Sequence, residues 1–474
     1  LTESSVGGFG AVDVDGMVKA AVLDKMADTT PGLQAEELSP MWLRDRLQKT
    51  LASVVDEKSD KEAGKPARQQ QQPSRSLPQS HKIVEKTEQG TPKHDQKAPE
   101  KQTDSKPKPD AKPSSSTKKR LSFEEIGQRF EKRRRRLESA CQRHKNSSEF
   151  NKLKPIFMNL PLYHNVSAKY CPIEKTSSWT WRGVLGSVRE ELREQGRPYL
   201  MGEGAKEILY TFTREPYSRL LSGYADKLFN PNTAFGWIYG KFMVTHFRKN
   251  ATQNSIVCGN DVTFPEFVKY FIHVQKQHTS SYRDGHFIPT HDHCDFCNIP
   301  YKYIGHQSTF LEDTNYILQV INSTFRYKKN YDAEAIDDYS TLYLKRLRPR
   351  VVKCMTLDEA ARRLWKSFKI RGILSKNQPF PFTLEQTQDL MHFDFTRAAM
   401  EAYTKSEPKS VRGKQREEAM REAFASVPLE DRLEVKQLLH LDFELFGFDP
   451  EPDTVFPKEP YKRDPNFSYF DVFN

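Results

Sequence analysis

The chain contains no apolar run that approaches the roughly 20 residues needed to span the hydrocarbon core of a bilayer. Aromatic residues are almost absent between Asp56 and Lys119, where Lys, Gln, Pro, Ser and Asp dominate. A segment of that composition buries too little apolar surface to offset the entropy that ordering would cost. Residues 1–120 are therefore predicted to form an N-terminal region and a disordered stem, with one short amphipathic helix at 40–57.

Acidic residues are outnumbered by basic ones, 63 to 74, and the formal net charge of the 474-residue chain is +11. An excess of positive charge favours anionic partners. Nucleic acids, phosphate-bearing cofactors and acidic polysaccharides all satisfy that condition, so charge alone does not choose between them.

Cysteine is scarce, but its number is even. The six cysteines are accompanied by five Asn-x-Ser/Thr glycosylation sequons, at Asn146, Asn165, Asn250, Asn322 and Asn466. Paired thiols and sequons are typical of proteins that fold in an oxidising lumen. We therefore expect disulfides and a secretory-pathway location.

A helix start follows the predicted stem. Ser122 and Glu125 have the spacing of a capping box, and the helical region is expected to cover residues 121–148 as it leads into the folded domain. Its basic block, Lys132–Arg136, has two interpretations. We favour a solvated helix face, and the alternative is a nuclear signal or a nucleic-acid patch.

Two short apolar segments, at 167–173 and 207–214, are predicted strands, each followed directly by a helix, one beginning near Trp179 and one covering 216–229. Strands that run into helices indicate a parallel sheet covered by helices, and hence the α/β class. Residues 330–430 are charged and helical in pattern, and the aromatic-rich segment 438–448 is expected to pack against the core. The domain is expected to end near residue 456, with residues 457–474 as a C-terminal tail.

The turn after the second strand carries Arg214 at its start and Ser222 on the following helix. Ligands of open α/β sheets bind at the carboxyl ends of the strands. An arginine fork and a hydroxyl at that place suit a bidentate anion. The alternative is that Arg214 simply pairs with Glu215 or Asp226.

The turn after the first strand carries Lys175, followed by Thr176, Ser177 and Ser178 at a helix N-terminus. Backbone N–H groups, hydroxyls and an ammonium together suit a phosphate. The turn is P-loop-like but lacks the glycines of G-x-x-x-x-G-K-[ST], which argues against an ordinary kinase or ATPase. One anion site after each of two strands predicts a ligand with phosphates at two ends.

These turns resemble those of the Golgi carbohydrate sulfotransferases, which use 3′-phosphoadenosine-5′-phosphosulfate (PAPS). "CPIEKTSSWTWRG" is similar to the family's 5′-phosphosulfate loop, with Glu174 in place of its Pro and Trp179 in place of its Thr. The segment from Arg214 to Lys227 matches R-x-P-x-x-R-L-x-S-x-Y-x-x-K, the 3′-phosphate motif. "HFIPTHDHCDFCNIPYKYIG" (residues 286–305) resembles the chondroitin/dermatan 4-O-sulfotransferase branch in particular.

The resemblance implies a sulfotransferase fold over residues 149–456, with the charged helices at 330–430 as an insert. It implies that Lys175, Thr176, Ser177 and Ser178 hold the 5′ side of PAPS, and that Arg214 and Ser222 hold the 3′-phosphate. Lys175 would also be catalytic, and His286 is the candidate general base. The alternative for His286 is a packed, hydrogen-bonded histidine.

No metal is required by this chemistry. Four residues of the "HDHCDFC" stretch could also be zinc ligands: His291, His293, Cys294 and Cys297. We favour disulfides for the two cysteines instead.

The expected function is sulfuryl transfer from PAPS to a sugar hydroxyl, namely the 4-OH of GalNAc in chondroitin or dermatan. The expected partner is an anionic polysaccharide or an N- or O-glycan, with no nucleic acid, and a homodimer is also considered. Because the sequence begins at Leu1 rather than Met, we expect a Golgi-lumenal type II protein whose N-terminal membrane anchor precedes this sequence. The alternatives are an inactive PAPS- or glycan-binding member of the family, and a basic nucleic-acid-binding protein.

Overall fold

The computed structural model describes residues 121–145, 155–163, 166–196, 206–277, 283–327 and 331–473. The chain divides into two units, residues 1–115 and 116–474, and all described residues lie in the second. The predicted stem and the predicted helix at 40–57 lie outside the described residues. Within the described ranges, no helix combines the length and the apolar character that crossing a membrane requires.

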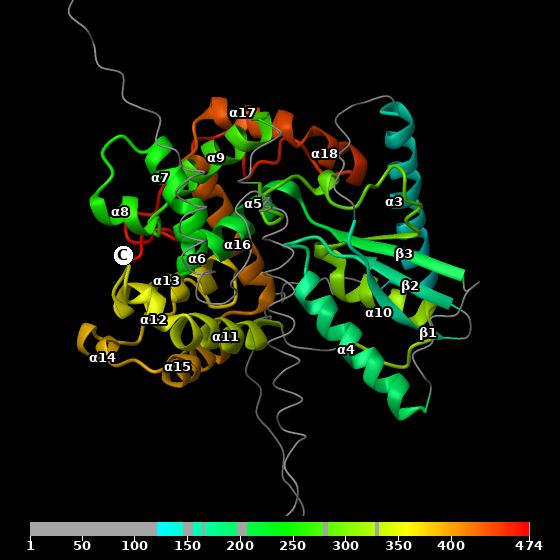
Figure 1. Ribbon diagram of the computed structural model, residues 1–474, viewed down its shortest axis with the longest axis horizontal. Coiled ribbons are helices and arrows are strands. Elements are labelled where there is room, and N and C mark those ends of the chain that lie inside the picture. Colours follow the sequence, from blue (N-terminus) through cyan, green and yellow to red (C-terminus); the bar gives the residue numbers. More distant parts are fainter. Residues whose placement is uncertain are drawn as a thin grey trace, which may run out of the picture. The chain divides into compact units, whose positions relative to one another are not determined.

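Four strands form one sheet in the order β1-β2-β3-β4. Figure 1 labels the first three, with β2 between β1 and β3. They are β1 (Met158–Tyr163), β2 (Val166–Cys171), β3 (Lys206–Thr213) and β4 (Tyr303–His306). β1 is antiparallel to β2, and the β2–β3 and β3–β4 pairs are parallel. The strands predicted at 167–173 and 207–214 are confirmed as β2 and β3, whereas β1 and β4 were not predicted.

Helices cover both faces of this sheet. On one face, α4 (Ser178–Glu194) and α10 (Phe310–Val320) bury the rings of Tyr170, Trp181 and Tyr210. On the other, the second half of α3 (Phe123–Arg143) and α18 (His440–Phe446) pack around Cys171 and Cys294. The expected α/β class and the packing of the aromatic-rich closing segment are therefore confirmed.

The start of α3 has the predicted capping box. Ser122 Oγ accepts from the Glu125 amide at 3.2 Å, and the Glu125 carboxylate accepts from the Ser122 amide at 2.6 Å. Its basic block divides into two parts. Arg134 and the exposed Arg135 pair with glutamates of the same helix, as a solvated face would, but Arg133 reaches the fully buried Asp313 at 2.8 Å.

A second hydrophobic core lies beyond the carboxyl ends of β2 and β3. Its centre is α5 (Pro216–Tyr224), which continues as a π-helical turn, η2 (Ala225–Phe229), together with α9 (Phe264–Gln277). The π-helix confirms the predicted helical extent of 216–229. The other short helical elements of the chain between η2 and α10 are α6 (Thr233–Phe235), η3 (Gly236–Gly240), α7 (Lys241–Phe247), α8 (Gln253–Cys258), η4 (Thr290–Asp292) and η5 (Gln307–Thr309).

Residues 331–404 form helices with a core of their own, in which Trp365 and Phe395 are buried. The helices are α11 (Tyr331–Thr341), η6 (Leu342–Arg346), α12 (Arg348–Val351), α13 (Leu357–Ile370), α14 (Leu384–Gln388) and α15 (His392–Thr404), with α16 (Lys409–Ala425) and α17 (Leu429–Leu438) following. The helical pattern predicted for 330–430 is thus confirmed. We use the label "helical insert" for residues 331–404, and that they are an insert in the family's fold stays a prediction.

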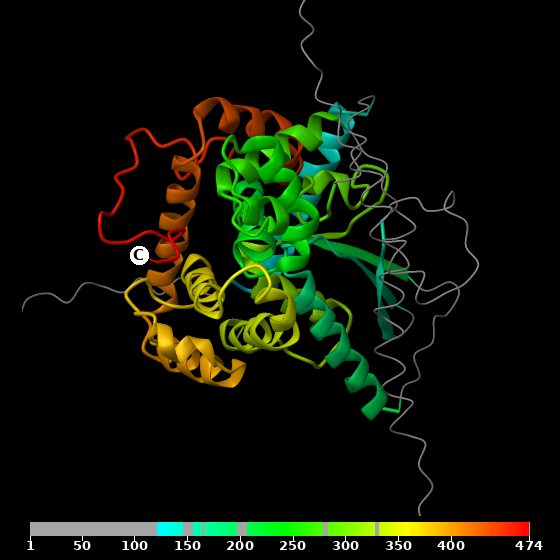
Figure 2. The same ribbon diagram turned by 60° about the vertical axis from the view of Figure 1, so that its left-hand side comes forward.

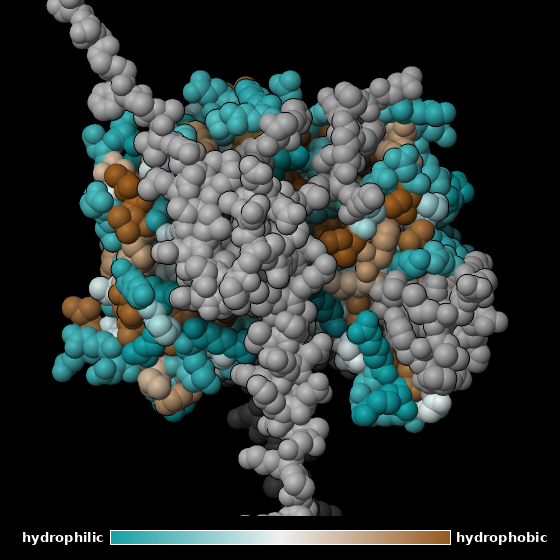
Figure 3. Space-filling model, viewed as in Figure 1, coloured by the Kyte–Doolittle hydropathy of each residue, from teal (hydrophilic) through white to brown (hydrophobic). Residues whose placement is uncertain are grey.

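The segment after α18 returns along α16, where the Tyr469 hydroxyl donates to Glu418 at 3.0 Å (Figure 2). On the face drawn in Figure 3, the described surface is mostly hydrophilic, and hydrophobic areas are small and separate. This surface agrees with the high charge of the sequence.

Candidate functional site

The loop between β2 and α4 has an unusual backbone. Lys175 and Ser177 both have positive φ angles, 69° and 71°, although neither is glycine. A non-glycine residue in this left-handed region costs on the order of 1–3 kcal/mol, and such strain is concentrated at functional sites. The loop is therefore held in a conformation that its own residues do not favour.

The N-terminus of α4 is open to an anion. Ser177 occupies the N-cap position but makes no side-chain capping hydrogen bond, and the first turn of α4 contains no acidic residue. The N–H groups at a helix N-terminus and the positive end of its dipole both attract negative charge. This is the environment expected for a phosphate, and Ser178 is the first residue of the helix.

Thr176 is placed differently from its neighbours. It is fully buried, and its hydroxyl donates to the Ile173 carbonyl at 2.9 Å, while its amide points at the same oxygen. Both polar groups of Thr176 are thus used to close the loop. A direct contact between Thr176 and PAPS, the expected sulfuryl donor, stays a prediction, and the hydrogen bonds of Thr176 do not favour that contact.

The Lys175 ammonium lies against a carboxylate that three cations share. Asp226, in the π-helical turn η2, lies 2.7 Å from Lys175 Nζ, 3.2 Å from Lys227 Nζ and 3.2 Å from Arg371 Nη2. The carboxylate neutralises only one positive charge, so the group keeps an excess of two. We call Lys175, Asp226, Lys227 and Arg371 the cation cluster.

Burial and charge act in opposite directions on the pKa values of this cluster. Burial alone would raise the pKa of Asp226, but the charges of Lys175, Lys227 and Arg371 hold it well below its usual value. For Lys175, burial is the largest effect and lowers the pKa to about 8, supported by Arg371 and Lys227 and opposed by Asp226. Lys175 is therefore a cation whose charge depends on pH near neutrality.

Arg214 joins the two predicted turns. It follows the last residue of β3, and its guanidinium donates to Ser218 Oγ at 2.8 and 3.0 Å and to the Lys175 carbonyl at 3.3 Å. Burial lowers its pKa to about 10, so it stays charged at neutral pH. The structure thus brings Arg214 beside the Lys175 loop, as the parallel pairing of β2 and β3 requires.

The alternative partners of Arg214 are engaged elsewhere. Glu215 caps α5 by accepting from the amides of Tyr217 and Ser218, and burial raises its pKa to about 7. Asp226 belongs to the cation cluster. Ser222 lies one turn along α5 from Ser218 and is half-buried, so Ser218 and Ser222 share the stripe of α5 on which Arg214 rests.

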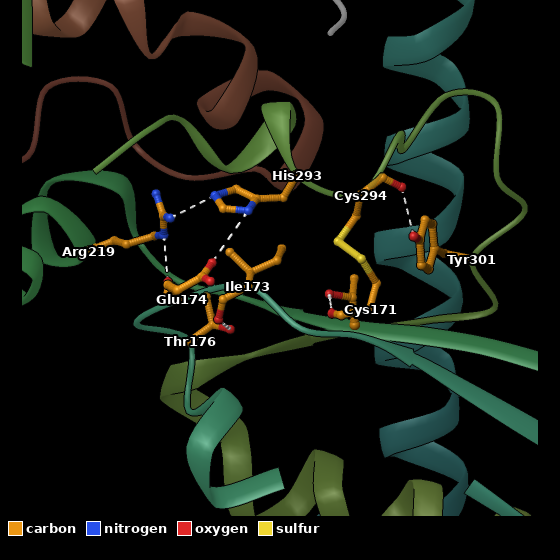
Figure 4. The surroundings of a disulfide bond; sticks show 9 residues. Cys171, Ile173, Glu174, Thr176, Arg219, His293, Cys294 and Tyr301 are labelled. Carbon is orange, nitrogen blue, oxygen red and sulfur yellow. Dashed lines mark hydrogen bonds and ion pairs between the residues drawn. A yellow bond between two sulfur atoms is a disulfide. The ribbon is translucent and has the colours of Figure 1, made fainter. Parts of the chain in front are cut away.

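Arg219, the second arginine of the 3′-phosphate motif, is buried inside the protein. It is 2% exposed and donates to the Glu174 carbonyl at 3.0 Å and the Gly285 carbonyl at 2.9 Å. Its Nη2 also lies 3.0 Å from His293 Nε2, and Figure 4 shows the two side chains pointing toward each other. Arg219 therefore braces the Lys175 loop against residues 285–293 and is not available to a ligand.

His286 lies in the segment that Arg219 braces. Its Nδ1 is 2.6 Å from an oxygen of Asp284, and its side chain is 25% exposed. Its ring packs 5.6 Å from Phe235, above which Lys227 Nζ lies at 5.2 Å. His286 and Lys227, a member of the cation cluster, thus both lie near the ring of Phe235, and a role for His286 in the site stays a prediction. The bond to Asp284 places a proton on Nδ1 and leaves Nε2 to accept one.

All six cysteines form disulfides, in the pairs Cys141–Cys297, Cys171–Cys294 and Cys258–Cys354. The disulfides expected from the sequence are therefore confirmed. The histidines of "HDHCDFC" are likewise engaged, His291 with Asp442 at 2.8 Å and His293 with Arg219. Among the described residues, no group of three or more His, Cys, Asp or Glu side chains is arranged to hold a metal ion.

Sequence reasoning predicted only Lys175 of the four cluster members as a site residue. Asp226 entered only as an alternative partner of Arg214, Lys227 only as the last position of the 3′-phosphate motif, and Arg371 not at all. No local signal marks Arg371, because it lies 145 residues from Asp226 in a segment with an ordinary charged helical pattern.

The fold and the site together indicate a class of ligand-binding protein. A mainly parallel sheet, with cations gathered where two adjacent strands end, is the arrangement of proteins that bind anionic, phosphate-bearing ligands. Within that class, residues 205–365 match the family model described as "Sulfotransferase family". This part of the chain is therefore similar to the sulfotransferase family, and the resemblance stated from the motifs is confirmed.

Known relatives are carbohydrate sulfotransferases. The chain is 26% identical to human (Homo sapiens) carbohydrate sulfotransferase 8 over 43% of its own length and 54% of the relative's. It is 38% identical to carbohydrate sulfotransferase 11 of Mus musculus over 23% and 32%, and 31% identical to carbohydrate sulfotransferase 14 of Danio rerio over 28% and 33%. The matches thus span about half or less of these relatives. No solved structure matches the chain.

Proposed function

We propose that this protein transfers a sulfuryl group from PAPS to a hydroxyl of a carbohydrate. The observation that carries the proposal is the cation cluster, in which Lys175, Lys227 and Arg371 surround one carboxylate beside the open N-terminus of α4. Arg214 adds a further cation next to the Lys175 carbonyl. These residues fit a donor that carries anionic groups at two ends.

PAPS, when bound, supplies a sulfuryl group attached to a phosphate leaving group. Lys175 neutralises the charge that develops on the oxygen linking sulfur and phosphorus, and Ser178 and the first amides of α4 bind the 5′-phosphate. Arg214 and Ser222 bind the 3′-phosphate. Because sulfuryl transfer resembles phosphoryl transfer, positioning and charge stabilisation supply most of the rate enhancement.

His286 acts as the general base in this proposal. Its Nε2 takes the proton from the sugar hydroxyl as that oxygen bonds to sulfur, and Asp284 stabilises the imidazolium that forms. The contact between Nδ1 and Asp284, at 2.6 Å, fixes the required tautomer. A base held in this way needs no metal.

Glu174, which replaces a proline of the family's loop, does not occupy the cation cluster. Its carboxylate lies 3.6 Å from His293 Nδ1, and its backbone carbonyl accepts from Arg219. The negative charge is therefore directed toward the bracing residues and not toward Lys175. This placement supports the enzyme over an inactive binding protein.

The acceptor we propose is GalNAc in chondroitin or dermatan, modified at its 4-OH in the Golgi lumen by a type II membrane protein. The support is the stretch 286–305, which resembles that branch of the family and, in this structure, runs from His286 to β4. The net charge of +11 suits an anionic polymer.

The test measures transfer of radiolabelled sulfate from PAPS to desulfated chondroitin, dermatan and other glycans, followed by disaccharide analysis of the labelled position. Arg214→Ala should lower kcat/KM by roughly 10- to 100-fold, because charge-assisted hydrogen bonds contribute about 1.5–3 kcal/mol. Arg397→Ala, an exposed arginine of the helical insert that pairs with Asp394, is the matched control and should retain full activity.

Two results would contradict the proposal. If no glycan is labelled although the product 3′-phosphoadenosine-5′-phosphate (PAP) raises the melting temperature, the protein binds the nucleotide without catalysis. If label moves but Arg214→Ala and Arg397→Ala behave alike, Arg214 does not hold the 3′-phosphate.

A further inference from the structure

Arg371 reaches the site from outside the segment that matches the family model, which ends at residue 365. It is the C-cap residue of α13, and Gly372 follows it with φ +62°. The Ile373 amide then donates to the Phe368 carbonyl at 2.8 Å. This glycine-terminated helix end fixes the direction in which the chain leaves α13 and so fixes the position of Arg371.

The guanidinium of Arg371 is oriented by an aromatic ring of the helical insert. Its central carbon lies 4.2 Å from the ring centre of Tyr339, on α11, and Nη2 lies 3.2 Å from Asp226. The next aromatic residue of that segment, Tyr343, donates from its hydroxyl to the Asp226 carbonyl at 3.0 Å. Tyr343 and Arg371 of the helical insert thus both contact Asp226 in the π-helical turn η2.

The charges of the cluster are not balanced. Within the part of the chain that the structure describes, Lys175, Lys227 and Arg371 share the single carboxylate of Asp226. The side chains of Lys175, Arg371 and Asp226 are only 13%, 19% and 7% exposed. Partly buried cations without counter-charges are costly. An arginine used only to hold the helical insert in place would need no surplus of positive charge, whereas a site for a multiply charged anion needs one.

We propose that Arg371 binds the 5′-terminal anion of the donor together with Lys175, so that the helical insert completes the donor site. This inference rests on the proposed function, because it takes the donor to be PAPS. Arg371 contacts the same carboxylate as Lys175, which places it on the 5′ side, whereas the guanidinium of Arg214 donates to Ser218 of α5. Its stacking on Tyr339 pre-orients the guanidinium for a bidentate contact with oxygen atoms.

The test compares two nucleotides by isothermal titration calorimetry on the whole chain. PAP carries both phosphates, and adenosine 3′-monophosphate lacks the 5′ group. Arg371→Gln should weaken PAP binding tenfold or more and leave the binding of adenosine 3′-monophosphate unchanged. Arg397→Ala, in the same helical insert, should alter neither. Circular dichroism melts check that each variant is folded.

Arg371→Lys keeps the experiment decisive if the glutamine variant does not fold, because it retains the charge but loses the planar fork. It should weaken PAP binding by a smaller factor and again spare adenosine 3′-monophosphate. Equal weakening of both nucleotides, or unchanged PAP binding in a folded variant, would overturn the inference and leave the proposed function standing. If the wild-type chain binds neither nucleotide, the proposed function itself fails.

Discussion

The pKa of Lys175 makes donor binding depend on pH. Burial lowers this pKa to about 8 in the free protein, and only the ammonium form attracts a phosphate. A bound dianion stabilises the ammonium and raises the pKa, so binding takes up a proton wherever free Lys175 is neutral. The affinity for PAP is therefore highest below pH 8 and falls as pH rises through that value.

The size of the effect follows from the titration curve. With a pKa of about 8, about a tenth of the Lys175 side chains remain charged at pH 9, so the Kd of PAP should rise roughly tenfold between pH 7 and pH 9. The second pKa of a phosphate ester is about 6, so the ligand stays dianionic over this range. Arg214, with its pKa lowered to about 10, stays largely charged up to pH 9.

The assay is calorimetry at pH 7, 8 and 9 in buffers of different ionisation enthalpy, which also counts the protons taken up. Lys175→Arg is the control, because arginine stays charged throughout and should bind PAP with little dependence on pH. A wild-type Kd that is constant from pH 7 to 9 would refute the reasoning. An equal slope in Lys175→Arg would assign the titration to another group.

Two further predictions concern the base and the disulfides. His286→Ala should lower kcat by roughly 10²- to 10⁴-fold and leave PAP affinity unchanged, as single-turnover kinetics and calorimetry would measure; an equal loss in PAP affinity would instead mean a packing role. Replacing Cys171 and Cys294 together by serine should cost about 2–5 kcal/mol in the free energy of unfolding and weaken PAP binding, because that disulfide ties the end of β2 to the segment that Arg219 braces. The same change at Cys258 and Cys354, which links α8 to the segment after α12, should lower stability alone, and equal PAP affinities in the two double variants would contradict this account.

The sequence by itself determined the local parts of the site. A short apolar segment, a turn and an amphipathic helix occur twice, and that pattern was enough to predict β2 with α4 and β3 with α5. The same pattern also predicted one anion site after each strand. Because parallel strands end at the same edge of a sheet, Arg214 reaches the Lys175 carbonyl. Turn chemistry, helix capping and hydrophobic periodicity depend on neighbours within a few residues, so they can be read directly from the sequence.

The tertiary structure alone decided which distant side chains complete the site. Nothing in the pattern around Arg371 indicates that it contacts Asp226. Nothing around Arg219 indicates that its guanidinium is buried and donates to backbone carbonyls. The disulfide partners were also open, because six cysteines allow 15 pairings. Such contacts depend on how whole elements pack, and the packing of α13 against the π-helical turn is the sum of many weak contacts that no short segment encodes.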